Sequence, residues 1–140
     1  MTRLGLIINP TSGKGNGKVH GELAKQTFLD AGVEVVDLSA ASYEEARANG
    51  VKAISEGKLD GLVVAGGDGM AHLGVNLCAG TNVPMGLIAC GTGNDAARTL
   101  GLPLVDGEIG DAEQPHFAVR PRLRAGPFDQ LVVVLVLARL

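Results

Sequence analysis

An apolar run that stops at three glycines and one aspartate constrains the fold of this chain more than any other stretch. Residues 62–65 have the length and the β-branched composition of the end of a strand that is buried on both faces. Gly66, Gly67 and Gly69 leave the main chain bare and allow backbone angles that other residues avoid. A helix-compatible segment then begins at Met70. Because a bare turn before a helix presents free N–H groups, this stretch predicts an anion-binding site.

The aspartate inside this turn adds a second constraint. A carboxylate at Asp68 would repel a phosphate group that binds to the same turn. Its presence is explained if a metal ion, or the proton of a nucleophile, lies between the carboxylate and the phosphate. The turn therefore favours metal-assisted chemistry on a phosphorylated ligand.

The composition agrees with a parallel α/β domain. The 140 residues contain 21 glycines and only 3% aromatic side chains, and they are enough for one domain. The net charge of −3 argues against a nucleic-acid partner. Cys78 and Cys90 lack metal-ligand spacing and are typical of buried thiols in a reducing compartment. With no secretory signal and no apolar run of the roughly 20 residues that a membrane span needs, we expect a cytoplasmic protein.

Four strand-length apolar runs alternate with segments of helical periodicity. The predicted strands are residues 4–8, 33–38, 59–65 and 84–89. The apolar faces of the predicted helices are Val19, Leu23, Ala24, Phe28 and Ala31; Tyr43, Ala46, Val51 and Ile54; Met70, Leu73, Leu77 and Cys78; and Ala96, Ala97 and Leu100. Gly32 and Gly57 are expected to end the first two helices. The alternation predicts a three-layer α/β fold with a mostly parallel sheet, Rossmann-like βα units and strand order 2-1-3-4.

Glycine-rich loops follow the first, third and fourth predicted strands. The first, residues 9–18, is not a Walker A loop, because Ser12 and Val19 stand where that motif needs glycine and a hydroxyl. The third contains Gly91-x-Gly93-x-x-Ala96, which fits a dinucleotide fingerprint only weakly because it follows the wrong strand. His72 is expected at the surface, and Asn76 is placed to reach back toward the turn. In the predicted strand order the three loops line one crevice, which suits a polyphosphate better than a single small anion.

Four motifs in this order resemble one known family. They are Asn9-Pro10-x-Ser12-Gly13, Gly66-Gly67-Asp68-Gly69, Pro84-x-Gly86 and Gly91-Thr92-Gly93-Asn94-Asp95-x-Ala97-Arg98. The chain resembles the catalytic, nucleotide-binding domain of the diacylglycerol kinase and sphingosine kinase family, and most of all the bacterial soluble lipid kinases. The resemblance covers residues 1–103. NAD kinases and phosphofructokinases share Gly67-Asp68-Gly69, but the run from Gly91 to Asp95 favours the lipid kinases.

The resemblance implies ATP as phosphoryl donor, Mg²⁺ as charge neutraliser and a lipid hydroxyl at the membrane surface as acceptor. It implies that Asp68 orders water around Mg²⁺ or takes the proton of the hydroxyl. The implied nucleotide contacts are Asn9, Pro10, Thr11, Ser12, Gly13, Ser39, Gly66, Gly67, Asp68, Gly69, Gly91, Thr92, Gly93, Asn94 and Asp95. Family members usually carry threonine where this chain has Met70.

The resemblance ends at Pro103, where the family continues into a large β-rich domain. Residues 104–140 are predicted to be a divergent tail, in which 105–126 form a loop or a disordered stretch. Residues 131–138 have the length and composition of a strand. This strand would either complete the sheet or remain exposed and promote aggregation. The change in composition is typical of a truncated or frame-altered product of a longer kinase, or of a deliberately shortened chain.

Three functional hypotheses follow. The first is the ATP-binding part of a lipid kinase that phosphorylates a diacylglycerol-type hydroxyl and is inactive alone. The second is a kinase that acts on NAD or another small hydroxyl acceptor, with a homo-oligomer supplying the missing groups. The third is a non-catalytic nucleotide-binding or interaction module.

Overall fold

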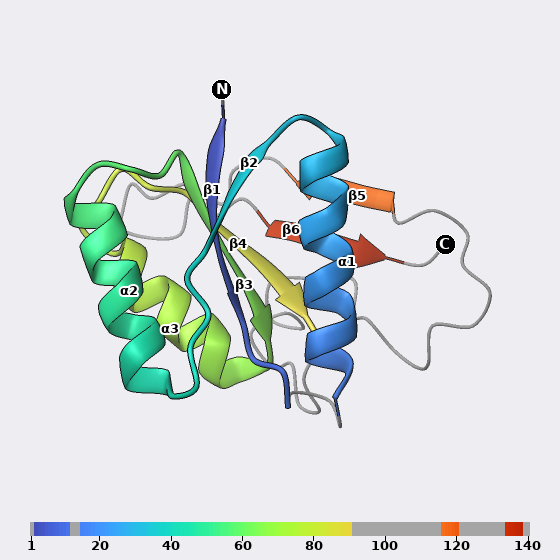
Figure 1. Ribbon diagram of the computed structural model, residues 1–140, viewed down its shortest axis with the longest axis horizontal. Helices are drawn as coiled ribbons and strands as arrows, with labels where there is room; N and C mark the ends of the chain where they lie inside the picture. The colour runs from blue at the N-terminus through green and yellow to red at the C-terminus, as the bar shows by residue number, and fades with distance from the viewer. Residues whose placement is uncertain (1, 12–14, 91–115, 121–133, 139–140) are drawn as a thin grey trace.

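The computed structural model describes residues 2–11, 15–90, 116–120 and 134–138. Three βα units and a further strand occupy the first 90 residues (Figure 1). In chain order these elements are β1 (Arg3–Ile8), α1 (Asn16–Asp30), β2 (Glu34–Asp37), α2 (Tyr43–Ser55), β3 (Gly61–Gly66), α3 (Asp68–Cys78) and β4 (Met85–Ala89). Two short strands, β5 (His116–Arg120) and β6 (Val134–Ala138), follow.

The first four strands form one parallel sheet in the order β2-β1-β3-β4, as the alternating pattern predicts. Leu4 is in register with Val35 of β2 on one side and with Gly61 of β3 on the other. Leu62 of β3 is in register with Met85 of β4. Parallel strands need crossover connections, and α1, α2 and α3 supply them.

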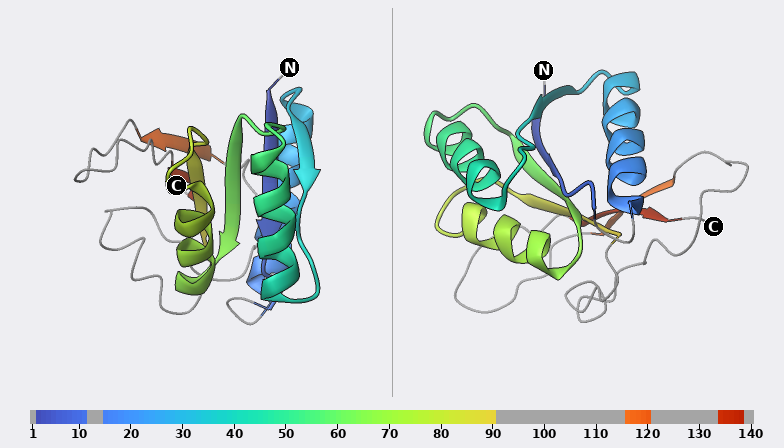
Figure 2. Two further views of the ribbon diagram at one scale, coloured as in Figure 1. Left: turned by 90° about the vertical axis from the view of Figure 1, so that its left-hand side faces the viewer. Right: turned by 60° about the horizontal axis from the view of Figure 1, so that its bottom comes forward.

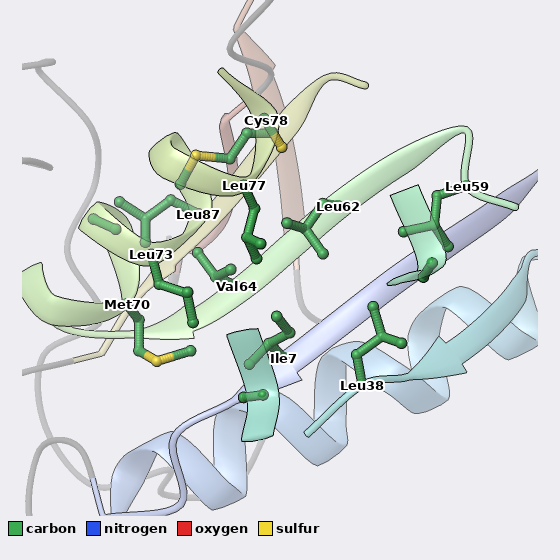
Figure 3. Packing of buried hydrophobic residues seen from close by; sticks show 14 residues of the cluster. Ile7, Leu38, Leu59, Leu62, Val64, Met70, Leu73, Leu77, Cys78 and Leu87 are labelled. Atoms are coloured by element: carbon green, nitrogen blue, oxygen red, sulfur yellow. The ribbon is translucent and has the colours of Figure 1, made fainter. Parts of the chain in front are cut away.

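The helices cover both faces of the sheet and create two separate cores. α1 lies on one face, and α2 and α3 lie together on the other (Figures 1 and 2). On the α2/α3 face, Ile7, Leu62 and Val64 pack against Leu73 and Leu77 (Figure 3). The core on the α1 face contains Leu6, Ile8, Val63, Ala65 and Ile88 with Ala24 and Phe28 of the helix. Side chains that alternate along the strands fill both cores, which explains the near-continuous apolar runs in the sequence.

The predicted helix ends are confirmed at two glycines. Gly32 and Gly57 follow α1 and α2 with φ of 78° and 67°, a left-handed conformation that glycine adopts without steric cost. After α1, the Val33 N–H donates to the carbonyl of Phe28 at 2.9 Å. These bonds satisfy carbonyl groups that the ends of the helices would otherwise leave unpaired.

The helical apolar faces are predicted only in part. Val19, Tyr43 and Val51, expected on the sheet-facing sides, are exposed. Small residues make the contacts instead: a Cβ on Gly21 would lie 2.6 Å from Ile8, and one on Gly50 would lie 2.6 Å from Leu77. A hydropathy pattern does not identify such positions, because glycine buries little apolar area. Its contribution is to let the helix approach the neighbouring element closely.

The region beyond the sheet differs from the sequence-based expectation. The stretch 105–126, predicted to be a loop, contains β5, which pairs antiparallel with β6 from Phe117–Leu137 to Arg120–Val134. The predicted strand in 131–138 is confirmed over Val134–Ala138. It does not hydrogen-bond to the four-stranded sheet but forms a second sheet with β5 and lies beside β4. The expectation failed because pairing with a distant strand leaves no local signal.

Candidate functional site

The turns after β1, β3 and β4 begin at the same edge of the sheet. The Asn9 N–H donates to the Ala65 carbonyl at 2.9 Å, and the Cys90 N–H donates to the Gly66 carbonyl at 3.0 Å. β1 and β3 are neighbours at the centre of the sheet. From β1 the chain crosses to β2 at one edge of the sheet, and from β3 it crosses to β4 at the opposite edge. The order of strands therefore reverses between β1 and β3, which is where open parallel sheets bind their ligands.

The helices that start at this edge differ in how their first N–H groups are satisfied. α1 starts after Gly15 and α3 starts after Gly67, and neither helix has a side-chain cap. α2, which follows the ordinary loop, is capped by Ser42, whose Oγ accepts from the Glu45 N–H at 3.2 Å. α2 also carries Glu44 and Glu45 in its first turn. Among the described helices, those behind the glycine-rich turns therefore lack a side-chain cap, and an uncapped helix N-terminus suits an anion.

The turn at residues 66–69 is tighter than expected. Gly66 is the last residue of β3, Gly67 is the N-cap, and Asp68 and Gly69 already belong to α3. The helix begins at Asp68 and not at Met70, because an acidic residue in the first turn interacts favourably with the helix dipole. None of the three glycines has a positive φ. These glycines therefore do not adopt the left-handed angles that glycine allows, and a bare main chain is what they contribute.

The first glycine-rich turn is partly described. The Asn9 side-chain oxygen accepts from the Thr11 N–H at 3.2 Å and from the Thr11 hydroxyl at 3.0 Å. This small turn directs the chain away from the end of β1 just before Pro10. Ser12 and Gly13, like the predicted contacts Gly91, Thr92, Gly93, Asn94 and Asp95, lie outside the described residues.

Ser39 lies at the same edge, joined to β1 by a hydrogen bond. Its Oγ accepts from the Ile8 N–H at 2.9 Å, directly before Asn9. Its own N–H donates to Oδ1 of Asp37 at 3.0 Å, and Oδ2 of Asp37 accepts from Lys25 Nζ at 3.3 Å. Partial burial raises the pKa of Asp37, but the hydrogen bonds from Ser39 and Lys25 outweigh it and hold this pKa below its ordinary value. The carboxylate is therefore ionised at neutral pH.

Two hollows flank the end of β1, and both are lined by Ile8, Pro10 and Ala40. The hollow on the α2/α3 side has a volume of about 210 Å³ and extends past Asn9 to Met70. The hollow on the α1 side has a volume of about 290 Å³, and its polar lining is Lys18, Glu22, Asp37 and Ser39. Met70, the departure from the family pattern, is buried and lines the first hollow.

The donor set was tested for a metal ion. In the part of the chain that the structure describes, no three His, Cys, Asp or Glu side chains are close enough to form a protein-only metal cluster. Mg²⁺ commonly keeps several waters and uses one or two carboxylates together with substrate phosphates. A single carboxylate at Asp68, beside a turn predicted to bind phosphate, fits that mode of binding.

Other residues that the sequence singled out have structural surroundings. Asn76 lies 2.9 Å from the His72 ring through its side-chain nitrogen and does not reach back to the turn. Cys78 and Cys90 are buried, as expected, and burial raises the pKa of each thiol to about 11. Neither thiol is a nucleophile at neutral pH. Within the described residues, no helix is long and apolar enough to cross a membrane.

Of the polar residues that line the hollow on the α1 side, the sequence predicted Ser39 as a contact but not Asp37. Asp37 and its partner Lys25 belong to a strand and a helix that the sequence located correctly, but no sequence pattern joins the two residues. The sequence contained one usable signal for Asp37. It is an acidic residue at the C-terminal end of a strand, and that strand follows a glycine-rich loop and a helix.

Comparison with known proteins agrees with this geometry. The sequence profile "Diacylglycerol kinase catalytic domain" matches residues 3–115, which extends the resemblance twelve residues beyond Pro103. A diacylglycerol kinase of Mycobacterium tuberculosis (strain H37Rv) is 38% identical over 99 residues, covering 69% of this chain and 31% of the relative. A diacylglycerol kinase of Bacillus subtilis (strain 168) is 37% identical over 108 residues, covering 76% of this chain and 35% of the relative.

A solved structure gives the same result. The structure of a putative diacylglycerol kinase from Bacillus anthracis str. Sterne superimposes with a TM-score of 0.57 and 30% identity over 72% of this chain and 37% of that one. The chain thus spans about a third of the length of these relatives. The family profile matches most of the chain, and the order of strands in the sheet is the one that the sequence predicts. The chain therefore belongs to the diacylglycerol kinase catalytic domain family.

Proposed function

We propose that this chain forms the ATP-binding part of a lipid kinase, with the triphosphate bound across the turns after β1, β3 and β4. One observation carries the proposal: among the described helices, the two without a side-chain cap, α1 and α3, follow glycine-rich turns at the reversal of strand order. Main-chain N–H groups and the positive ends of two helix dipoles would then face one ligand. Membership of a kinase family supports ATP as that ligand.

The proposed roles are those that the resemblance to the kinase family implies. Asn9, Pro10, Thr11, Ser12 and Gly13 are proposed to contact the phosphates. The glycines at 66, 67 and 69 let the ligand approach the main chain, and Gly91, Thr92, Gly93, Asn94 and Asp95 are proposed to contact the nucleotide. Ser39 contacts the nucleotide beside Ile8. Each of these groups binds and orients, because phosphoryl transfer depends on positioning and electrostatics.

Asp68 is proposed to hold Mg²⁺ through water, or to accept the proton of the acceptor hydroxyl. The carboxylate lies at the first residue of α3, adjacent to the main chain that would bind phosphate. Mg²⁺ supplies neutralisation of the phosphate charge when it is bound. With the ion present, a carboxylate beside the phosphates becomes favourable rather than repulsive.

The acceptor is proposed to be a diacylglycerol-type hydroxyl at the cytoplasmic surface of a membrane. The names of the curated relatives support this acceptor. Because the chain corresponds to about a third of their length, we infer that transfer needs groups from the part that the chain does not span, and that the chain alone binds ATP without transferring phosphate.

Calorimetric titration with Mg·ATP tests the binding step. We expect the wild-type chain to bind, and Asp68→Asn to weaken binding about tenfold and to remove its dependence on Mg²⁺, because one charge-assisted interaction is lost. Glu44→Gln is the matched control, since it removes a first-turn carboxylate from the capped helix α2. Unchanged Mg²⁺ dependence in Asp68→Asn would refute the role of Asp68, and absence of Mg·ATP binding by the wild type would refute the nucleotide site.

Transfer of radiolabelled phosphate from ATP distinguishes the acceptors. With diacylglycerol vesicles we expect no labelled lipid from this chain alone. Labelled product from NAD would instead support the small-molecule kinase. Labelled lipid would show that the part of the relatives beyond this chain is dispensable for transfer.

A further inference from the structure

The hollow on the α1 side of the site has a polar lining that phosphate binding does not explain. Its volume is about 290 Å³, and its polar lining comes from Lys18 and Glu22 of α1 and from Asp37 and Ser39. It adjoins Pro10 at the proposed phosphate site. Ionised carboxylates repel phosphate but accept hydrogen bonds from hydroxyl groups. The lining is therefore suited to the hydroxyl-bearing part of a ligand whose phosphates lie next to it.

Asp37 is held in a fixed position at the rim of this hollow. It is the last residue of β2, in register with Leu6. Its carboxylate accepts from the N–H of Ser39 and from the ammonium group of Lys25. A carboxylate offers about four acceptor positions, so a further donor can still bind. Because its protein partners fix the group, little ordering is needed when a ligand arrives.

The topology places this carboxylate where a nucleoside sugar would lie. β1, the glycine-rich turn, α1 and β2 form one βαβ unit, and Asp37 follows Gly17 by about 20 residues. In doubly wound folds an acidic residue at this spacing accepts a hydrogen bond from a ribose hydroxyl while the phosphates lie on the helix N-terminus. α1 has such an N-terminus, without a side-chain cap.

We propose that Asp37 binds a ribose hydroxyl of the nucleotide and makes the site select ribonucleotides over deoxyribonucleotides. This inference rests on the proposed function, because it requires the triphosphate to lie at the adjoining turns. Glu22 lines the same hollow, and both carboxylates are exposed, but Asp37 is held by hydrogen bonds from the Ser39 N–H and from Lys25. A freely rotating carboxylate loses more entropy on binding than one that its neighbours already hold. Selectivity is therefore assigned to Asp37.

Calorimetry of the full 140-residue chain with Mg²⁺ and three nucleotides, ATP, 2′-deoxy-ATP and 3′-deoxy-ATP, tests the proposal. We expect the wild type to bind ATP about tenfold more tightly than at least one deoxy analogue, the effect of one hydrogen bond to a charged group. In Asp37→Ala this ratio should fall to about one. A purely structural role for Asp37 would weaken all three nucleotides equally and leave the ratio unchanged.

Two control variants separate the carboxylate from its surroundings. Glu34→Gln removes a carboxylate at the other end of β2, and Glu22→Gln removes the second carboxylate of the hollow. Both are expected to keep the wild-type ratio. Circular dichroism verifies that each variant is folded, and Asp37→Asn replaces Asp37→Ala if the latter unfolds.

The possible failures are distinguishable. Equal binding of ATP and both deoxy analogues by the wild type would overturn the ribose contact while leaving the triphosphate site intact. A ratio that survives in Asp37→Ala, or that is lost only in Glu22→Gln, would overturn the assignment to Asp37. Absence of binding by all three nucleotides would refute the proposed function and, with it, this inference.

Discussion

Gly21 and Gly69 show how the same residue type serves packing in one place and leaves room in another. A Cβ on Gly21 would lie 2.6–2.7 Å from three atoms of the buried Ile8 side chain, so α1 can approach β1 only without a side chain there. A Cβ on Gly69, in the first turn of α3, would have no neighbouring heavy atom within 4 Å. The fold therefore requires glycine at position 21 and not at position 69.

The two corresponding alanine variants should respond in opposite ways. Gly21→Ala is expected to destabilise the chain by about 1–3 kcal/mol, because Ile8 or α1 must shift. Gly69→Ala is expected to be neutral or to stabilise by up to about 1 kcal/mol, because alanine favours a helix, but to weaken Mg·ATP binding. Urea unfolding and calorimetry measure the two effects. Wild-type ATP affinity in Gly69→Ala would contradict the close approach of ligand to this turn.

At the scale of elements, one of the three described helices has a side-chain cap at its N-terminus and two have none. Ser42→Ala removes the side-chain cap of α2 and should cost about 1 kcal/mol without changing ATP affinity. Gly67→Ser offers α3 a cap at a residue whose φ of −94° serine tolerates. It should add a few tenths of a kcal/mol and weaken ATP binding by competing for the same N–H groups. Thermal melts with and without Mg·ATP measure both, and equal ATP shifts in both variants would contradict the prediction.

The sequence predicts the strands better than the helix surfaces. The central strand β3 is buried on both faces, so the apolar run at residues 62–65 locates it, and the alternation of strands and helices predicts the sheet order. The start of α3 at Asp68 was missed, because glycines obscure a helix boundary. The contact between Lys25 and Asp37 was missed because it joins two elements across a distance that no local pattern records. Motif order identified the candidate site, whereas the polar hollow beside it required coordinates.

At the scale of the whole molecule, β5 and β6 connect the last part of the chain to the sheet. β6 pairs with β5 and lies beside β4. We expect deletion of residues 131–140 to lower the melting temperature and the soluble yield, because β5 loses its hydrogen-bonding partner. The sequence alone predicted the opposite, a gain in yield when an exposed strand is removed. Measuring both quantities for the shortened chain decides between these expectations, and a higher soluble yield would support the exposed strand.

A nucleotide that binds at the N-termini of α1 and α3, as proposed, would also stabilise the folded chain. By mass action, a ligand present at 100 times its dissociation constant adds about 2.7 kcal/mol to the free energy of unfolding. That amount is a large fraction of the total stability of a typical domain. The lifetime of the folded chain in a cell would then rise and fall with the nucleotide supply.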